Sequence, residues 1–439
     1  PRSLIYHEGR AFRVHRAKLP PGARPGDDGR LATETLSICN ECGASHPGEE
    51  CERCHACGAG MPGVHPVRNV LRIENVETKP VERITANDEE RQRQGFEIQT
   101  VFAWPRRAGA LDVRAAIARD VSGPIFRIDY APGATISRLN KGLRRRASKS
   151  ILGFGIDPAT GYWTASPADG GDDEQTPVGA VKQRVVPIVQ DTKNALLLRF
   201  SAGPLPEVAM ATLQHALARG LSLVFQLEEG EVTTEPVPSR ERRSAILAFE
   251  VAEGGAGVLT RLATEPHALA QVARKAIELM HFREIEPAIA GADPSLLHDD
   301  TDVPCVKACY RCLLSYYNQP DHEQIDRTDA DVLTTLLRLA RSEVEPVGRV
   351  GAAAAANDKD WRAALSRWGL PSPDDEPLSL DGVVLSLAWR DHLVAGSIGP
   401  LESTALAAAE ALGFTVVALP DVPGDSPPEP LLQALGADR

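Results

Sequence analysis

The sequence predicts an α+β protein with several domains, and three observations lead to this fold class. The chain has 439 residues, 43% of them hydrophobic and 25% charged, which gives enough length for about two to four cores. Alternating apolar residues, typical of strands, dominate up to about residue 200, and helical spacing dominates after it. All eight cysteines fall into two clusters, at 39–57 and at 305–312.

The first part of the chain predicts β-structure around a cysteine-rich module. Residues 4–15 read as two short strands around a Glu-Gly turn, and a Pro/Gly-rich loop follows at 20–29. Beyond the first cysteine cluster, residues 70–73 and 96–102 alternate between apolar and polar. The predicted boundaries are 1–30 for the hairpin segment, 31–69 for the cysteine-rich module and 70–200 for a β-rich domain.

Residues 201–343 predict a mixed α/β domain that contains the second cysteine cluster. Apolar residues recur at helical spacing in 206–217 and 266–280. Between them, 245–249 reads as a buried strand that runs into a Gly-rich turn at 253–257. A further helix follows the cysteines, with Thr328 and Asp331 as candidate caps. Its predicted inward residues are Val332, Leu336, Leu337 and Ala340.

The last hundred residues predict a linker and a small unit. Residues 344–376 are rich in Ala, Gly and Pro, which favours a linker around one short helix. Residues 377–439 form a small α/β unit, with predicted strands at 383–385, 394–396 and 414–419 and an Ala-rich helix at 403–412.

Composition excludes some classes of protein. The net charge of −12 argues against wholesale coating of nucleic acid, although it leaves room for a local basic groove. No apolar run reaches the ~18 residues of a membrane span, so we expect no membrane partner. The chain starts Pro1-Arg2-Ser3 without a signal peptide, so we expect a fragment or a processed chain. Clustered cysteines without a signal indicate metal binding in a reducing cytoplasm.

The first cysteine cluster has the spacing of a four-thiolate zinc site. Cys39-Asn40-Glu41-Cys42-Gly43 and Cys54-His55-Ala56-Cys57-Gly58 are two C-x-x-C-G knuckles. Two thiolates at i and i+3 can point at one ion, and the Gly relieves crowding behind them. We therefore predict a structural zinc site and a zinc-ribbon-like module. Cys51 is a fifth cysteine in this cluster. It could be a ligand instead, because Cys51 and Cys54 are separated by the same two residues as Cys54 and Cys57. Only the Cys54/Cys57 pair is followed by a Gly, so we favour a free thiol at Cys51.

The second cluster supplies three thiolates, from Cys305, Cys309 and Cys312. A second zinc ion then needs a fourth ligand, which must be His, Asp or water. We assign His322, while His281, at the end of the preceding helix, stays open as an alternative. His298 and Asp302 are further alternatives, and a reduced buried trio without metal is another.

Two stretches resemble a known family. Residues 249–259 (FEVAEGGAGVL) and 309–319 (CYRCLLSYYNQ), with His322, Asp326 and Arg327, resemble the DUF1998 region, also called the MrfA-type zinc-binding domain. This region lies at the C-terminal end of large superfamily 2 DEAD/DEAH-box helicases. Residues 75–78 with 88–96, and 153–157 with 161–163, are similar to the segment before that domain. The resemblance covers roughly residues 4–340. One departure is Val303, where the family commonly has a fourth cysteine.

The resemblance implies an accessory region of an ATP-dependent DNA helicase, in anti-phage systems such as DISARM and Druantia or in DNA repair. The chain has no G-x-x-x-x-G-K-[ST] loop, so we expect no catalytic site of its own. ATP and Mg²⁺ would enter only through a motor, either in cis upstream or in trans on another chain. Asp88-Glu89-Glu90-Arg91 looks like a magnesium box but follows a polar segment, so we interpret it as a solvated helix start.

A basic segment is the candidate contact with DNA, single-stranded or at a junction. No acidic residue lies between Asp129 and Asp157, and cations there could neutralise several phosphates without reading sequence. A solvated surface or a protein-docking patch is the alternative use. The candidate residues are Arg138, Lys141, Arg144, Arg145, Arg146 and Lys149.

Two functions remain in competition. The first is the helicase accessory region. The second is a non-catalytic scaffold that binds a separate helicase, and other subunits, in a defence complex. Residues 377–439 resemble nuclease-like appendages of the same family, but Asp381 has no E-x-K partner on the next strand, so we expect a degenerate unit.

Overall fold

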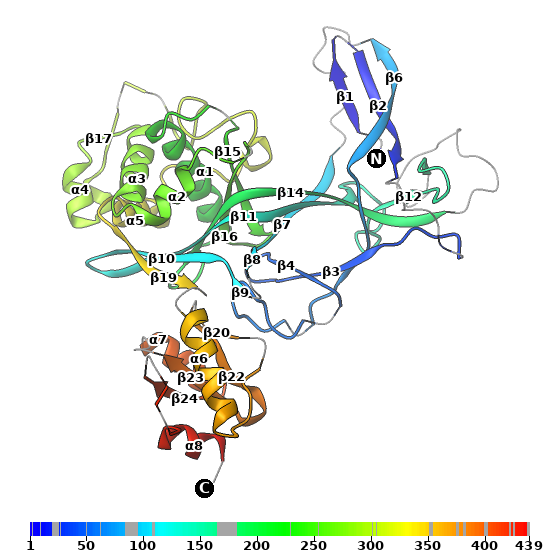
Figure 1. Ribbon diagram of the computed structural model, residues 1–439. Helices are drawn as coiled ribbons and strands as arrows, with labels where there is room; N and C mark the ends of the chain where they lie inside the picture. Colours follow the sequence, from blue (N-terminus) through cyan, green and yellow to red (C-terminus); the bar gives the residue numbers. More distant parts are fainter. Residues whose placement is uncertain are drawn as a thin grey trace. The chain divides into compact units, whose positions relative to one another are not determined.

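The computed structural model has mixed α and β structure and is β-rich in its first half (Figure 1). It divides into two compact units. The first consists of Pro1–Glu52, Met61–Phe102 and Thr135–Asp191, and the second of Arg53–Gly60, Ala103–Ala134 and Thr192–Arg439. The structure describes residues 1–439 except 2, 9, 20–25, 27, 50, 62, 84–94, 108–109, 165–181, 229, 253, 301, 304, 351–353, 375–376, 381–382, 399–402, 421–422, 425 and 437–439.

Three predicted features involve residues outside the described ones. They are most of the Pro/Gly loop, Asp88-Glu89-Glu90-Arg91 and Asp381. Among the helices that the structure describes, none is long and apolar enough to cross a membrane.

The first unit is built from strands. A three-stranded antiparallel sheet starts with the predicted hairpin, in which Leu4 pairs with Arg13 and His7 with Arg10. β5 buries Val67, Val70 and Leu71, and Asn69, with a left-handed φ of 57°, interrupts the alternation between them. The strands are β1 (Leu4–His7), β2 (Arg10–Lys18), β3 (Glu34–Ile38), β4 (Ser45–Pro47), β5 (Val67–Arg72), β6 (Asn75–Arg83), β7 (Phe96–Ala103), β12 (Phe154–Ile156) and β13 (Trp163–Thr164).

Glycines allow two close backbone approaches in this unit. Gly153 has φ +75°, and a Cβ on it would lie 2.0 Å from the carbonyl oxygen of Val185. Gly161 has φ +79°, and its Cβ would lie 2.3 Å from the carbonyl oxygen of Ala17. Only glycine fits both the left-handed backbone and these contacts. This explains the Gly-x-Gly segment at 153–155 and the glycine at 161.

Two long strands contribute residues to both units: β11 (Gly123–Leu143) and β14 (Gln183–Phe200). In the first unit β14 pairs in parallel with β5, and in the second it pairs antiparallel with β16. The remaining strands of the second unit up to residue 350 are β8 (Arg106–Arg107), β9 (Ala110–Leu111), β10 (Val113–Asp120), β15 (Val232–Pro238), β16 (Arg243–Glu250), β17 (Phe282–Arg283), β18 (His298–Asp299) and β19 (Glu343–Val350).

The helices of the second unit between residues 207 and 340 pack around one apolar core. The predicted stripes are confirmed: Leu269, Val272 and Ile277 are buried, as are the four residues predicted to face inward on α5. The predicted strand at 245–249 is the buried centre of β16. The helices are α1 (Glu207–Val224), α2 (Val258–Thr264), α3 (Ala268–Leu279), α4 (Glu286–Gly291) and α5 (Ala330–Ala340).

Two local expectations for this unit differ from the structure. The N-cap of α5 is Asp329, whose carboxylate accepts hydrogen bonds from the amides of Asp331 and Val332; Thr328 instead bonds Asp326. The first residues of the predicted linker 344–376 belong to a strand, β19 (Glu343–Val350), which pairs antiparallel with β10. Neither its Gly nor its Pro prevents pairing, because only one edge of β19 is occupied in the described sheet.

The predicted strands at 383–385, 394–396 and 414–419 and the predicted helix at 403–412 are present in the C-terminal residues. The helix of the predicted linker belongs to the same part, because its Trp361 and Leu365 are buried in the C-terminal core. A parallel pair, β23 and β24, packs with helices around Trp361, Trp389 and Leu431. The elements are α6 (Ala354–Arg367), β20 (Leu378–Leu380), β21 (Val383–Leu385), β22 (Leu387–Trp389), β23 (Val394–Ile398), α7 (Ser403–Ala411), β24 (Thr415–Leu419) and α8 (Glu429–Leu435).

Candidate metal centres and nucleic-acid interface

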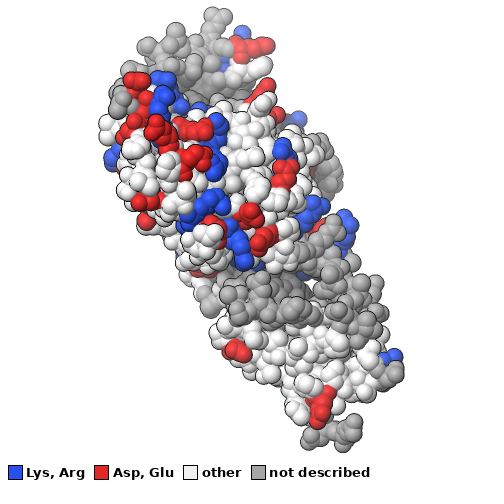
Figure 2. All heavy atoms as spheres, turned by 90° about the vertical axis from the view of Figure 1, so that its left-hand side faces the viewer, with Lys and Arg blue, Asp and Glu red and all other residues white. Residues whose placement is uncertain are grey.

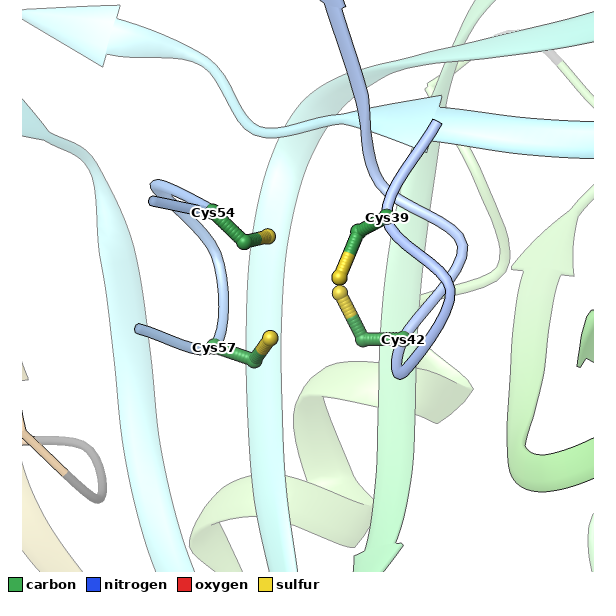
Figure 3. Close-up of side chains that lie close together, drawn as sticks. All are labelled: Cys39, Cys42, Cys54 and Cys57. Atoms are coloured by element: carbon green, nitrogen blue, oxygen red, sulfur yellow. The ribbon is translucent and has the colours of Figure 1, made fainter. Parts of the chain in front are cut away.

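The four thiols predicted for the first site lie together. The Sγ atoms of Cys39, Cys42, Cys54 and Cys57 are all within 4.8 Å of one another. Figure 3 shows the side chains of each knuckle pointing toward the other knuckle. Three of the thiols are buried, which shields a bound ion from water.

The knuckle turns explain this convergence. In the first turn the Gly43 amide donates to the carbonyl of Cys39 at 3.0 Å, and in the second the Gly58 amide donates to that of Cys54 at 2.8 Å. Both glycines have a positive φ, 78° and 75°. The left-handed residue lets the chain turn back behind the sulfur atoms, as the trailing Gly predicted. Four thiols are the donor set that Zn²⁺ prefers in structural sites, so the residues fit a zinc ion.

Cys51 is outside this group of four, in agreement with the prediction that it is the spare thiol. Its Sγ lies within 4.8 Å of ring nitrogens of His46 and His55, in a separate group. The guanidinium of Arg106 lies 2.6 Å from Nδ1 of His55. That nitrogen therefore accepts a hydrogen bond from a cation, which opposes metal binding at the same atom.

The second site is completed by His281. Its ligand atom and the Sγ atoms of Cys305, Cys309 and Cys312 are all within 4.8 Å of one another. The sulfurs of Cys305 and Cys312 are 3.8 Å apart. Tetrahedral zinc with Zn–S bonds of about 2.3 Å holds its sulfurs roughly 3.8 Å apart, so this edge already has the required length. Nε2 of His281 is 3.3 Å from Sγ of Cys309. A Cys₃His set also fits a structural zinc ion.

His322, the residue that we assigned as fourth ligand, does not join these thiols in the structure. Its Nε2 lies 3.0 Å from the carbonyl oxygen of Ser315 and 2.9 Å from Oδ1 of Asn318. Its ring meets Tyr310 edge-on, with centroids 5.7 Å apart. His281, one of the alternatives left open, takes the position instead. His298 and Asp302 are not in the group either.

Backbone geometry and one buried arginine position the second site. His281 follows α3 with a φ of +65°, a left-handed conformation that is costly for a residue other than glycine. Arg327 is 3% exposed and donates to the carbonyl of Met280 at 3.1 Å and to that of Cys305 at 2.6 and 3.0 Å. Arg327 thus ties the segment before His281 to the loop of Cys305. Arg327 lies in the stretch that resembles the DUF1998 region, but nothing in its local sequence pattern predicts that it connects these two segments.

The thiols of the second site have unequal acidity. Burial is the largest single effect on Cys309 and would raise its pKa, but the hydrogen bonds with His281, with Cys312 and with the backbone of Arg311 and Cys312 together outweigh burial and lower the pKa to about 6. Burial raises the pKa of Cys312 to about 12 and also raises that of Cys305. One thiolate beside His281 is therefore available at neutral pH, and a bound cation would favour deprotonation of the others. Four protein ligands on one zinc ion would leave no open position for a substrate, which is the arrangement of a structural site.

A buried polar network supports the loop that follows the second site. Asp321 is 3% exposed and accepts from Arg243 at 2.7 Å and from Arg240 at 3.1 Å, while His215 Nε2 lies at 2.9 Å. Burial would raise the pKa of Asp321, but the hydrogen bond with His215 and the two guanidinium charges lower it to about 2. The carboxylate therefore stays charged and joins α1, the β15–β16 turn and the end of the loop.

The basic segment 138–149 is only partly available to a ligand. Arg138, Arg144, Arg145 and Lys149 are exposed, and Lys141 is half-buried. The structure corrects the prediction that Arg146 is available to contact DNA. Its side chain is 2% exposed, lies 2.6 Å from Glu97 and donates to the carbonyl of Lys149. Glu97, distant in sequence, also pairs with Lys149 at 3.4 Å. The run of sequence without acidic residues did not reveal this carboxylate, because β7 brings it from another part of the chain.

On the face that Figure 2 draws, the surface charge of the helical part of the second unit is mixed. Figure 2 shows Lys and Arg interspersed with Asp and Glu over the helical part of the second unit. An electrostatic contact with DNA would therefore be local rather than spread over this face.

Comparisons with known proteins identify the part of the chain around the second site. Residues 213–313 match the family model described as the MrfA Zn-binding domain, a range that contains His281 and all three cysteines. The predicted family resemblance is confirmed over this range. No curated protein matches the chain. A solved structure, the crystal structure of the DUF1998 helicase MrfA bound to DNA, aligns with 60% of this chain and 27% of that chain, at 10% identity and a TM-score of 0.28.

Proposed function

We propose, from the MrfA-type zinc-binding domain at 213–313, that this chain is the zinc-containing accessory region of an ATP-dependent superfamily 2 DNA helicase. The observation that carries the proposal is the agreement between the matched range and the site geometry. The family model covers the one stretch in which His281, Cys305, Cys309 and Cys312 converge. In this proposal the zinc ions stiffen loops, and a motor in cis or in trans supplies ATP hydrolysis.

The DNA contact of this proposal uses the exposed part of the basic segment. Arg144 and Arg145 are exposed neighbours at the end of β11, and Arg144 keeps its Nε on the carbonyl of Phe96 at 3.1 Å. That bond fixes the side chain while leaving its charge at the surface. Arg138, Lys141 and Lys149 would add phosphate contacts. The buried Arg146 would instead stabilise the turn through its contacts with Glu97 and the carbonyl of Lys149.

Fluorescence anisotropy with a labelled single-stranded oligonucleotide, repeated at rising salt, tests this contact. We expect the affinity of the Arg144→Ala/Arg145→Ala variant for the oligonucleotide to fall. The slope of log Kd against log salt should decrease by roughly 1 to 2, because the variant makes fewer phosphate contacts and its binding therefore releases fewer counterions from the DNA. The matched control is Arg10→Ala/Arg13→Ala, which removes two exposed arginines from β2. Equal slopes for the two double variants would contradict the basic contact.

A second candidate, the scaffold that binds a separate helicase, is favoured by the charge balance of the chain. Glu97 neutralises part of the basic segment, and the chain as a whole carries a net charge of −12. The same anisotropy series separates the two functions. Absence of salt-sensitive DNA binding in the wild-type chain, with zinc bound, would support the scaffold and contradict the accessory region that contacts DNA.

The biological setting can be tested in the source cell. We expect a helicase motor either upstream in the same reading frame or in a neighbouring gene. Deletion of the coding sequence should sensitise cells to phage if the setting is defence, or to DNA-crosslinking agents if it is repair. Normal survival under both challenges would contradict both settings.

A further inference from the structure

The loop that carries the second zinc ligands exposes an unusual number of aromatic rings. We call residues 305–320 the tyrosine loop. Tyr310, Tyr316 and Tyr317 are 63%, 62% and 69% exposed, and Val306 is 83% exposed. Isolated exposed apolar residues are common, but a group of this size within one short loop typically marks a binding surface.

The tyrosine loop is held firmly from below. Cys312 and Leu313 have no exposed surface. Asn318, 6% exposed, accepts from the amide of Ser315 at 2.8 Å and donates to the carbonyl of Leu313 at 2.8 Å, so it closes the turn that presents Tyr316 and Tyr317. His322 contacts the same Asn318 and supports Tyr310. The rings are therefore presented on a fixed backbone, which reduces the entropy lost when a ligand binds.

The charge of the tyrosine loop is opposite to that of the chain. It contains Lys307 and Arg311 and no acidic residue, whereas the chain carries −12. Arg311 is exposed, and Lys307, whose side chain is 70% exposed, forms a salt bridge with Asp326 at 3.7 Å. Two cations beside exposed rings match a ligand that has both planar groups and phosphates.

Ring geometry also suits stacking. The centroids of Tyr316 and Tyr317 are 5.6 Å apart and their planes cross at 87°. Because the rings meet edge to face, they do not cover each other's faces fully, and at 62% and 69% exposure much of each ring remains accessible. The outer surface is formed mainly by tyrosine rings and cations, with Val306 as its one exposed large aliphatic residue.

We propose that the tyrosine loop binds single-stranded DNA by stacking bases on Tyr316 and Tyr317, with Lys307 and Arg311 beside the phosphates. The inference rests on the proposed function and adds to it a contact that depends on bases rather than on charge alone. Stacking of this kind does not read sequence, because every base has a flat face.

The test uses the full chain, a labelled single-stranded oligonucleotide and two paired variants. Tyr316→Ala/Tyr317→Ala should weaken binding roughly tenfold for each ring that stacks. Tyr316→Phe/Tyr317→Phe keeps the rings and should bind like the wild type. Tyr6→Ala, which removes a 41% exposed tyrosine from β1, is the matched control. Zinc content and circular dichroism establish that each variant is folded.

Two further readouts identify stacking. The alanine pair should leave the slope of log Kd against log salt unchanged, since it removes no charge. An oligonucleotide containing 2-aminopurine should lose fluorescence on binding to the wild type and to the phenylalanine pair, but not to the alanine pair.

The outcomes separate the inference from the proposed function. Wild-type affinity in the alanine pair, or equal losses in the alanine and phenylalanine pairs, would overturn stacking on these rings. If binding still responded to salt and to Arg144→Ala/Arg145→Ala, the proposed function would survive that result. A wild-type chain that binds no single-stranded DNA would remove both.

Discussion

At the residue scale, the cysteine ligands were predictable and the histidine ligand was not. The C-x-x-C-G spacing is local, so Cys39, Cys42, Cys54 and Cys57 could be assigned from the sequence alone. His281 precedes its cysteines by a long segment and reaches them only through the end of α3, a left-handed turn and the contacts of Arg327. Proximity in sequence to the three cysteines favours His322 over His281 as the fourth ligand, although His322 does not reach them in the structure. The prediction that Arg146 is an accessible DNA contact is wrong for a similar reason, because its partner Glu97 lies on a strand distant in sequence.

The two histidines give a direct test of the second site. We expect wild-type protein to contain two zinc ions per chain by elemental analysis. After dialysis against a chelator, His281→Ala should retain only one, because removing one of the four protein ligands opens the second site to water and to the competing chelator. His322→Ala should still contain two. Loss of zinc from His322→Ala with full zinc in His281→Ala would show that the ligand set is wrong.

At the element scale, helices with strong apolar stripes were predicted well because their spacing alone fixes the buried face. For α3 and α5 the predicted inward residues are buried. Short polar signals were less reliable. Thr328 and Asp329 are both good N-cap residues, and the sequence does not say which one has the extended backbone that a cap needs. In the structure it is Asp329, with ψ 124°.

The cap assignment predicts a difference between neighbouring variants. Asp329→Ala removes the acceptor for two amides at the start of α5 and should lower the free energy of unfolding by about 1 kcal/mol. Thr328→Ala, the control, removes only a bond to Asp326 and should cost less. Urea unfolding followed by circular dichroism measures both. A larger loss in Thr328→Ala would restore the cap that the sequence suggested.

At the scale of the whole molecule, ion pairs within the second unit make its stability depend on pH. Asp120, whose side chain is fully buried, contacts Arg338 and Arg341 at 2.7 Å each. Burial would raise the pKa of Asp120, but the hydrogen bonds from these arginines outweigh it and lower the pKa to about 2. An unfolded Asp has a pKa of about 3.9. The stabilisation is therefore complete above roughly pH 5 and is lost as the pH falls toward 2.

This shift predicts a measurable slope. The free energy of unfolding of the wild type should fall between pH 5 and pH 3, as Asp120 and Asp321 take up protons on unfolding. In Asp120→Asn the fall should be smaller, by about 1 to 2 kcal/mol, while zinc release at low pH affects both proteins equally. Parallel pH profiles for the two proteins would show that the Asp120 carboxylate does not contribute. Urea titrations at several pH values provide the comparison.

The pairing of β10 with β19 has a consequence for how the chain is made. Arg119 pairs with Glu343 and Val113 with Val350, so β10 receives this partner only after the chain has been synthesised as far as residues 343–350. Until then, the amides and carbonyls on this side of β10 have no β19 to pair with and can pair with other strands. A polypeptide released at residue 343, the predicted end of the zinc-binding domain, would keep that edge open permanently. The eight residues of β19 thus act as a late closure against aggregation.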